Sequence, residues 1–169
     1  MTRTPTPRPN SPGSPRRDDR SSGNKSIAEI DKEIIKTINQ LTDGLHTYPI
    51  RQMVEDAEKF GPFLRKQRLE TNQVRKFLDA VNRLKAKLTQ GEIDETTPRD
   101  ATLVFQEIEP EIVLLKPKLA YAAARQKAAK PLSDVMSAAI DRVHSLEDFN
   151  RLVQLIESII AYHKAEGGK

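Results

Sequence analysis

The sequence predicts an all-α fold, a compact bundle of about five to six helices that follows a disordered N-terminal tail. Apolar residues recur at spacings of three and four from residue 26 onward, which is the period of a helix with one buried face. No long stretch alternates apolar and polar residues as a half-buried strand does. Aromatic residues make up 5% of the chain and tryptophan is absent, so aliphatic side chains must build the core.

Composition excludes several classes of protein. A chain of 169 residues fits one domain of ordinary size. The absence of cysteine excludes a disulfide framework, a thiolate metal site and a cysteine nucleophile. The longest apolar runs, Ile112–Leu115 and Leu119–Ala124, are too short to cross a membrane, and the N-terminus lacks the apolar region of a secretory signal. We therefore expect a soluble cytoplasmic protein with no membrane partner.

Residues 1–25 differ in composition from the rest of the chain. Five of the eleven prolines fall in the first fifteen positions, among Ser, Thr, Gly and Arg. Such a segment buries too little apolar surface to offset the entropy of ordering it. Its charge of +4 equals that of the whole chain. We predict a disordered tail over 1–25, which either solubilises the protein or adds contacts with nucleic acid, and a neutral helical domain over 26–169.

Start and stop signals predict two helices before residue 70. Ser26–Glu29 forms a capping box for the first helix, and Gly44 ends it. Pro49 opens the second, which Gly61-Pro62 interrupts or kinks before the chain continues helically to about Leu69. The apolar residues that share a face in these two helices are Ile27, Ile30, Ile34, Ile38 and Leu41, then Ile50, Met53, Val54, Ala57 and Phe60.

A third helix is predicted from the N-cap Thr71 to Gly91. Beyond an acidic loop, Thr97-Pro98 indicates a fourth start, with Leu103, Val104 and Ile108 as its apolar residues. The apolar residues predicted for the third helix are Val74, Phe77, Leu78, Val81, Leu84 and Leu88.

Prolines define the helices that follow. Pro110 and Pro117 break the region into pieces, with Pro117 at the first position of a short helix to about Ala128. Pro131 opens another helix. The last helix is capped by Ser145 and Asp148 and closed by Gly167-Gly168. The apolar residues predicted for the last two helices are Leu132, Val135, Met136, Ala139, Ile140 and Val143, then Phe149, Leu152, Val153, Ile156, Ile159 and Ile160.

No group of residues suggests an enzyme. The motifs of serine hydrolases, P-loop proteins and zinc proteases are absent from the sequence. The three histidines, His46, His144 and His163, lack the spacing of metal ligands, so we expect surface or capping roles for them, with His163 favourably placed at a helix end. The cluster of Glu107, Glu109 and Glu111 has no further oxygen ligands at a defined spacing. We therefore predict no catalytic residue, no metal and no cofactor.

The charge of the neutral domain is arranged in alternating blocks. Lys76, Arg83 and Lys87 form one stripe on the third helix, away from its buried face. Lys118 and Arg125 share a face seven residues apart, next to alanines of low relief. Such faces suit a phosphate backbone, and an ordinary solvated surface is the alternative. The net charges are −4 over 26–58, +7 over 59–87, −6 over 88–115, +5 over 116–130 and −2 over 131–169.

Three motifs resemble one protein family. Leu114–Arg125, with the sequence LLKPKLAYAAAR, closely resembles a stretch of the small helical subunit of type III-A CRISPR effector (Csm) complexes. Thr71–Phe77 is similar to that family's helix start, and the ending from Asp148-Phe149 to His163-Lys164 is similar to its last helix. The resemblance covers about 48–169. The tail and, less clearly, the first helix fall outside it, and Gly61-Pro62 places a proline where the family usually has a continuous helix.

The resemblance implies a non-catalytic subunit that serves antiviral defence. Several copies would stack head to tail, beside the backbone subunits, which cut the target RNA, and below the large polymerase-like subunit. They would contact the duplex of guide (CRISPR) RNA and target RNA through its sugar-phosphate backbone. The RNA-binding residues expected from matched motifs are Arg75, Lys76, Lys116, Lys118, Tyr121 and Arg125, and those expected from charge geometry alone are Lys66, Arg83, Lys87 and Lys127.

Two alternatives stay open at this point. Tyr121 either contacts RNA or belongs to the core, because a tyrosine beside an alanine-rich packing face usually buries its ring. The protein is either an RNA-scaffolding subunit or a helical protein–protein adaptor whose basic face meets an acidic partner without RNA contact. Modules that read splayed bases carry paired aromatics on a sheet. Since the chain lacks these, we expect backbone contacts without an aromatic stacking platform.

Overall fold

The computed structural model describes residues 29–91 and 100–167. Those residues form helices and connecting turns without a strand, which confirms the predicted all-α class. The predicted tail over 1–25, the cap at Ser26 and the helix start at Thr97-Pro98 lie outside the described residues. The elements are α2 (Ile30–Asn39), η1 (Leu45–Thr47), α3 (Ile50–Lys66), α4 (Thr71–Gly91), α5 (Ala101–Val113), α6 (Leu115–Arg125), η2 (Lys127–Ala129), α7 (Lys130–Ile140) and α8 (Leu146–Ala165).

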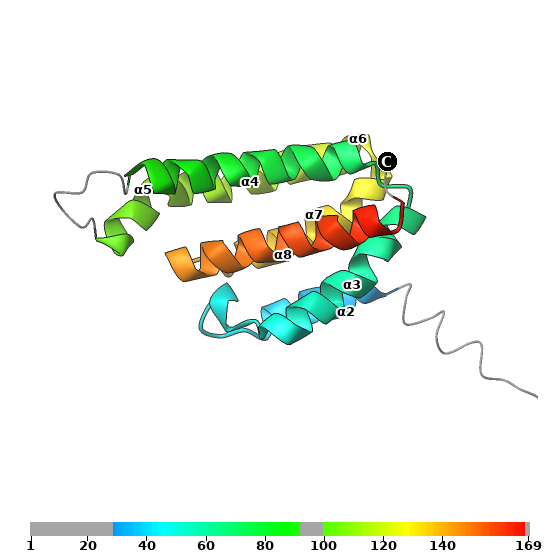
Figure 1. Cartoon of the computed structure of the whole chain (residues 1–169), viewed down its shortest axis with the longest axis horizontal. Helices are drawn as coiled ribbons and strands as arrows, with labels where there is room; N and C mark the ends of the chain where they lie inside the picture. Colours follow the sequence, from blue (N-terminus) through cyan, green and yellow to red (C-terminus); the bar gives the residue numbers. More distant parts are fainter. Residues whose placement is uncertain (1–28, 92–99, 168–169) are drawn as a thin grey trace, which may run out of the picture.

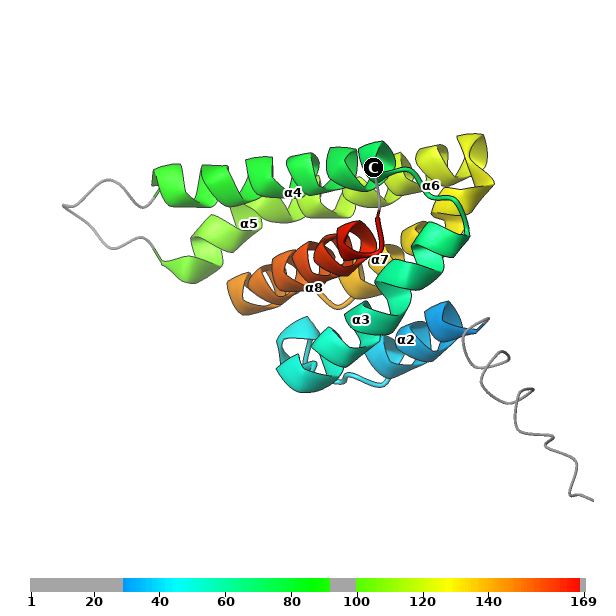
Figure 2. The same ribbon diagram turned by 45° about the vertical axis from the view of Figure 1, so that its right-hand side comes forward.

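The helices form three layers. Helix α4 lies alongside α5 and α6 on one side of the molecule, and α2 and α3 lie on the other (Figures 1 and 2). Helices α7 and α8 occupy the middle, where α8 packs against both α3 and α4, and α7 packs against both α2 and α6. Two outer layers therefore cover a central pair of helices, and each outer layer presents its far face to solvent.

The core is mainly aliphatic, as the sequence predicted, although all five phenylalanines are also buried in it. Helix α2 buries Ile30, Ile34 and Ile38, which are spaced by four residues and lie on one face. At the centre of the molecule α8 is buried on several sides, and Phe149 and Ile156 have no contact with solvent. Burial of such side chains is the main favourable contribution to folding, about 1.5–3 kcal/mol for each.

Helix α3 runs through the predicted interruption at Gly61-Pro62. Pro62 lies inside the helix, and the carbonyl that loses its helical partner belongs to Glu58, which is an exposed residue. Gly61 is buried against α8, where an added Cβ would lie 2.6 Å from the backbone nitrogen of His163. The glycine therefore allows close helix packing, and the predicted interruption is wrong. Ile50, expected on the buried stripe, is 54% exposed at the start of α3.

Two predicted boundaries, those at Thr71 and Pro117, shift in the middle of the chain. Thr71 is the first residue of α4, not its cap, and its hydroxyl is buried without a hydrogen-bond partner. Asp100 caps α5 and accepts a hydrogen bond from the Thr102 amide at 2.9 Å. Pro117 is the third residue of α6 rather than its first. The first turn of a helix tolerates proline at its first or its third position, because the backbone amides there have no hydrogen-bond partner within the helix.

Pro110 does not break the helix in which it lies. Helix α5 continues past it to Val113, and the carbonyl that loses its helical partner belongs to the exposed residue Gln106. Leu103, expected among the apolar residues of this helix, is 59% exposed. Helix α6 ends at Arg125, three residues before the predicted end, and the chain continues into η2.

Asp148 joins the start of α8 to η1. The Ser145 hydroxyl accepts a hydrogen bond from the Asp148 amide at 3.1 Å, which confirms the predicted cap. The buried Asp148 carboxylate accepts hydrogen bonds from the backbone amides of His46 at 2.7 Å and His144 at 2.9 Å, and from Nδ1 of His46 at 2.7 Å. Burial raises the pKa of Asp148, but these hydrogen bonds outweigh it and hold the pKa below its usual value.

His163 corrects a prediction about the histidines. It is wholly buried on α8, not placed at the surface. Its Nε2 lies 3.0 Å from the carbonyl oxygen of Leu69, so Nε2 carries the proton that is donated. Burial lowers the pKa of His163, the nearby charge of Arg65 lowers it further, and the hydrogen bond to Leu69 opposes both effects. The ring is therefore a neutral structural group rather than a cation at the helix end.

Candidate nucleic-acid interface

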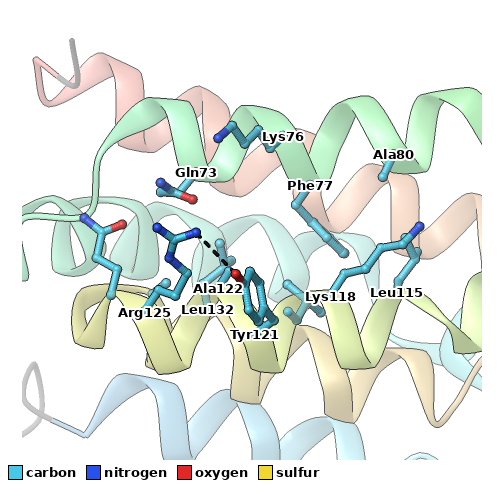
Figure 3. Close-up of a pocket in the computed structure, with 13 residues that line it drawn as sticks. Gln73, Lys76, Phe77, Ala80, Leu115, Lys118, Tyr121, Ala122, Arg125 and Leu132 are labelled. Atoms are coloured by element: carbon cyan, nitrogen blue, oxygen red, sulfur yellow. Dashed lines mark hydrogen bonds between the residues drawn. The ribbon is translucent and has the colours of Figure 1, made fainter.

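A groove of about 650 Å³ lies between α4 and α6, with η2 and the beginning of α7 at its side. Figure 3 shows the side chains of α4 facing those of α6 across it. Its floor is apolar, with Phe77 from α4 and Leu119 from α6 as its larger side chains. The residues that line it are Gln73, Lys76, Phe77, Ala80, Leu115, Lys118, Leu119, Tyr121, Ala122, Arg125, Gln126, Ala129 and Leu132.

Three cations surround this apolar floor. Lys76 comes from α4, and Lys118 and Arg125 come from α6; all three are exposed. None of the residues lining the groove is acidic. A concave surface with charges of one sign concentrates the electrostatic potential and attracts ligands of the opposite sign. The groove is therefore an anion-attracting site that also offers apolar contact.

The helical period explains why these side chains meet. Residues 118, 121 and 125 are separated by three and four positions, so they share one face of α6. Leu115 and Leu119 are buried and fix how α6 is rotated against the core. On α4, Val74, Phe77 and Val81 are buried, which leaves Lys76 at the edge of the groove.

Tyr121 belongs to the groove and not to the core. It is 64% exposed, so the alternative of a buried ring is wrong. Arg125, one turn later on the same face, donates a hydrogen bond from Nη1 to the Tyr121 hydroxyl at 3.3 Å. Its guanidinium carbon lies 5.7 Å from the ring centroid, within the range of a cation–π contact. Figure 3 shows this pair at the mouth of the groove.

Two of the predicted cations have acidic partners within the chain. Lys87 on α4 forms an ion pair with Glu111 on α5. Lys116 lies 2.5 Å from a carboxylate oxygen of Asp141. A phosphate would have to compete with these carboxylates. The pairs join residues 24 and 25 positions apart, so helical spacing gave no sign of them.

The remaining predicted cations are exposed but do not line the groove. Arg75 and Arg83 lie on α4, Lys66 ends α3 and Lys127 begins η2. The structure thus brings four of the ten predicted residues into the groove and distributes the others over the surrounding surface. Contact of any of the ten with RNA stays a prediction.

Two glutamines in the groove were not predicted. Gln73 lines it from α4, and Gln126 lies just after the end of α6. The Oε1 atom of Gln126 is buried and has no hydrogen-bond partner. Neither residue carries charge, so counting charges could not find them. Gln126 directly follows the motif that ends at Arg125, which is the one signal that could have drawn attention to it.

Within residues 29–91 and 100–167, no three His, Asp or Glu side chains gather closely enough to hold a metal ion. In the same ranges, no helix combines the length and the apolar character of a membrane span.

A family model described as Csm2 Type III-A matches residues 47–169. The match begins in η1, extends to the end of the chain and includes every residue that lines the groove. It leaves out α2. No curated protein and no solved structure matches the chain.

Proposed function

Because the chain belongs to the Csm2 family of small structural subunits of type III-A CRISPR effector complexes, we propose that it holds the guide–target RNA duplex through its sugar-phosphate backbone. Several copies stack head to tail beside the backbone subunits and below the large polymerase-like subunit. The protein itself is not an enzyme, and the complex works in the cytoplasm. The observation that carries the proposal is the groove in which Lys76, Lys118 and Arg125 meet without an acidic neighbour.

Contacts with the backbone are sufficient for such a subunit. In an RNA-guided complex, base pairing between guide and target already reads the sequence. Phosphate contacts fix position and carry no sequence information directly. The domain over 26–169 is neutral overall, so one copy should bind weakly. Copies in a row increase the effective concentration of each site, and weak contacts then add up along the duplex.

The alternating charge blocks suit contact between copies. A head-to-tail interface joins two different surfaces of the same protein. The block over 59–87 carries +7 and the block over 88–115 carries −6. Opposite charges on two surfaces favour an arrangement in which one surface meets the other on the next copy.

The proposal is tested by RNA binding across a salt series. The full chain, the triple variant Lys76→Ala/Lys118→Ala/Arg125→Ala and a control triple variant are compared on one labelled RNA duplex by fluorescence anisotropy. The control removes Lys32, Lys36 and Lys59, three exposed cations of α2 and α3 on the opposite side of the molecule (Figure 1). Because every protein keeps the basic tail, differences between the variants report the groove.

We expect the groove variant to lose affinity and to show a shallower salt dependence. The slope of log K against log salt changes by roughly one for each phosphate contact removed, and the control should keep the slope of the unchanged protein. Equal losses of RNA affinity in the groove variant and the control variant would mean that the positive charges bind RNA non-specifically and that the groove is not a defined site. No RNA binding by the unchanged protein, together with binding of an acidic protein, would favour the adaptor.

A further inference from the structure

We propose that the groove takes one unpaired nucleotide of an RNA strand, with its base stacked on Tyr121 and its phosphates held by Lys118 and Arg125. This inference rests on the proposed function and goes beyond it, because a paired base inside a duplex cannot reach the ring. It replaces the expectation that the protein has no aromatic stacking platform. The groove then distinguishes single strands, loops and displaced nucleotides from a continuous duplex.

The Tyr121 ring lies in an unusual place for an aromatic side chain. An aromatic side chain normally buries its ring, yet this ring is 64% exposed at the mouth of a cavity. Lys118 lies one turn before it and Arg125 one turn after it on the same face of α6. The hydrogen bond from Arg125 to the hydroxyl at 3.3 Å restrains the ring in this position. Lys118 and Arg125 therefore lie on either side of Tyr121 along the helix. A base stacked on the ring would have its two flanking phosphates near these two cations.

The apolar floor of the groove indicates that its ligand is more than a phosphate. Phosphate oxygens require cations and amide donors, but they require no apolar cavity. The groove has both, because the cations surround a floor built from Phe77, Leu119 and Ala122. Its volume of about 650 Å³ lies within the usual range for sites that enclose small molecules. A nucleotide combines a flat apolar face with an anionic backbone, so it satisfies both parts of the site.

Gln126 contributes an unpaired side-chain oxygen beside the groove. Its Oε1 is buried and lacks a hydrogen-bond donor, and such an atom is costly to leave unpaired. If the Gln126 side chain turns its oxygen toward the groove that it lines, the exocyclic amine of adenine, cytosine or guanine would supply that donor. Gln73, on the α4 side of the groove, offers a second amide to the edge of a base. Unpaired bases are commonly recognised by this combination of stacking and edge contacts.

An acidic peptide with one apolar side chain is the competing occupant. It would also use the cations and the apolar floor. The neighbouring side chains of Tyr121 and Arg125 favour a flat aromatic ligand over an aliphatic side chain, because a planar ring gains from both an aromatic face and a guanidinium.

The test uses three short RNA ligands and the full chain. The first is a single strand with 2-aminopurine at its centre, whose fluorescence falls when the base stacks. The second is a strand of the same length without bases, which keeps the phosphates. The third is a continuous duplex. The proteins are the unchanged chain, Tyr121→Ala, Tyr121→Phe and the control Leu103→Ala, which shortens an apolar side chain that is 59% exposed on α5.

We expect Tyr121→Ala to weaken binding of the base-bearing strand by about 5- to 100-fold and to abolish the fall in 2-aminopurine fluorescence. The loss for the strand without bases should be much smaller. Tyr121→Phe should bind nearly as well as the unchanged chain, because it keeps the ring, and Leu103→Ala should show no change. Circular dichroism checks that each variant keeps its helical content.

Three results would overturn the inference. The first is equal affinity of the unchanged chain for strands with and without bases. The second is a Tyr121→Ala variant that binds and quenches like the unchanged chain. If the duplex still binds through Lys76, Lys118 and Arg125 in those cases, the proposed function stands without the stacking site. The third is binding of an acidic peptide by a chain that binds none of the three RNA ligands, which overturns both proposals.

Discussion

His163 on α8 and Leu69 in the connection between α3 and α4 are joined by a hydrogen bond of 3.0 Å from the buried imidazole Nε2 to the backbone carbonyl oxygen. The same residue contributes the backbone nitrogen that lies close to Gly61 of α3. His163 therefore links α8 both to α3 and to the connection between α3 and α4, and its protonation state bears on the stability of this part of the bundle.

The stability of the protein should fall as the solution is acidified below the ordinary histidine pKa. Burial lowers the pKa of His163 in the folded state, so the unfolded chain takes up this proton at a higher pH than the folded chain. The free energy of unfolding consequently decreases as pH falls through about 6.5 toward the folded pKa. Urea unfolding at several pH values between 8 and 5 measures this, with His163→Gln as the comparison. An equally steep decrease in His163→Gln would assign the effect to other groups.

Replacing Asp148 should destabilise the fold. Asp148→Ala leaves the backbone amides of His46 and His144 without their buried acceptor, and each such loss costs about 1–3 kcal/mol. Urea unfolding at neutral pH provides the measurement. Asp134→Ala is the matched control, because the Asp134 side chain is 43% exposed and pairs only with the exposed Lys130 in the contacts observed; its effect should be below about 1 kcal/mol. Similar effects of the two changes would contradict the structural role of Asp148.

Gly61→Ala should change stability in the direction opposite to helix propensity. Alanine in a helix interior is favoured over glycine by about 1 kcal/mol. Here the added Cβ would lie 2.6 Å from the backbone nitrogen of His163 and 2.7 Å from Cβ of Tyr162, and overpacking of this kind costs about 1–3 kcal/mol. A lower melting temperature confirms the close packing, whereas a higher one shows that α3 and α8 move apart readily.

Ile156→Ala should cost about 2–5 kcal/mol, because it opens a cavity in a fully buried part of α8. Leu115→Ala should cost a similar amount, although Leu115 also lines the groove and its effect on ligands is less simple. Chemical unfolding measures both. Leu103→Ala serves as the exposed comparison and should stay within about 0.5 kcal/mol of the unchanged protein. An unchanged unfolding curve for Ile156→Ala would contradict the burial of this face.

Arg125→Ala should weaken duplex RNA binding more than Arg75→Ala does. Both arginines are exposed and lie in matched motifs, but only Arg125 lines the groove. Anisotropy titrations at two salt concentrations measure the difference, and circular dichroism should show unchanged helicity in both variants. If Arg75→Ala has the larger effect, the RNA-binding surface lies along the outer face of α4 instead.

Periodicity predicted most of the core but placed several boundaries wrongly. Ile30, Ile34 and Ile38 are buried because a spacing of four residues repeats on one face of any helix. The predicted helix breaks at Pro62 and Pro110 were wrong. A helix accepts a proline when the carbonyl that loses its partner belongs to an exposed residue, as at both of these positions. Sequence alone does not show which carbonyls are exposed, because that depends on how the helices pack.

The candidate site was predicted only in part for a related reason. The cations of α4 and α6 were each recognised on their own helix. Lys76 and Arg125 are far apart in the chain, and their meeting across one groove depends on how α4 and α6 pack together. The exposure of Tyr121 likewise follows from the rotation of α6 that Leu115 and Leu119 fix. Spacing in the sequence predicts which residues share a face of one helix. The packing of the helices decides which of these faces lie against one another.

The packing of helix α2 determines where a truncated version of this protein should begin. The family match begins at residue 47, yet α2 covers α7 with three buried isoleucines that precede that point. A fragment limited to the matched region would expose an apolar surface along α7, which would promote aggregation. The region matched by the family model is thus shorter than the region that must fold together. Any shortened version intended for crystals or assembly studies should keep α2.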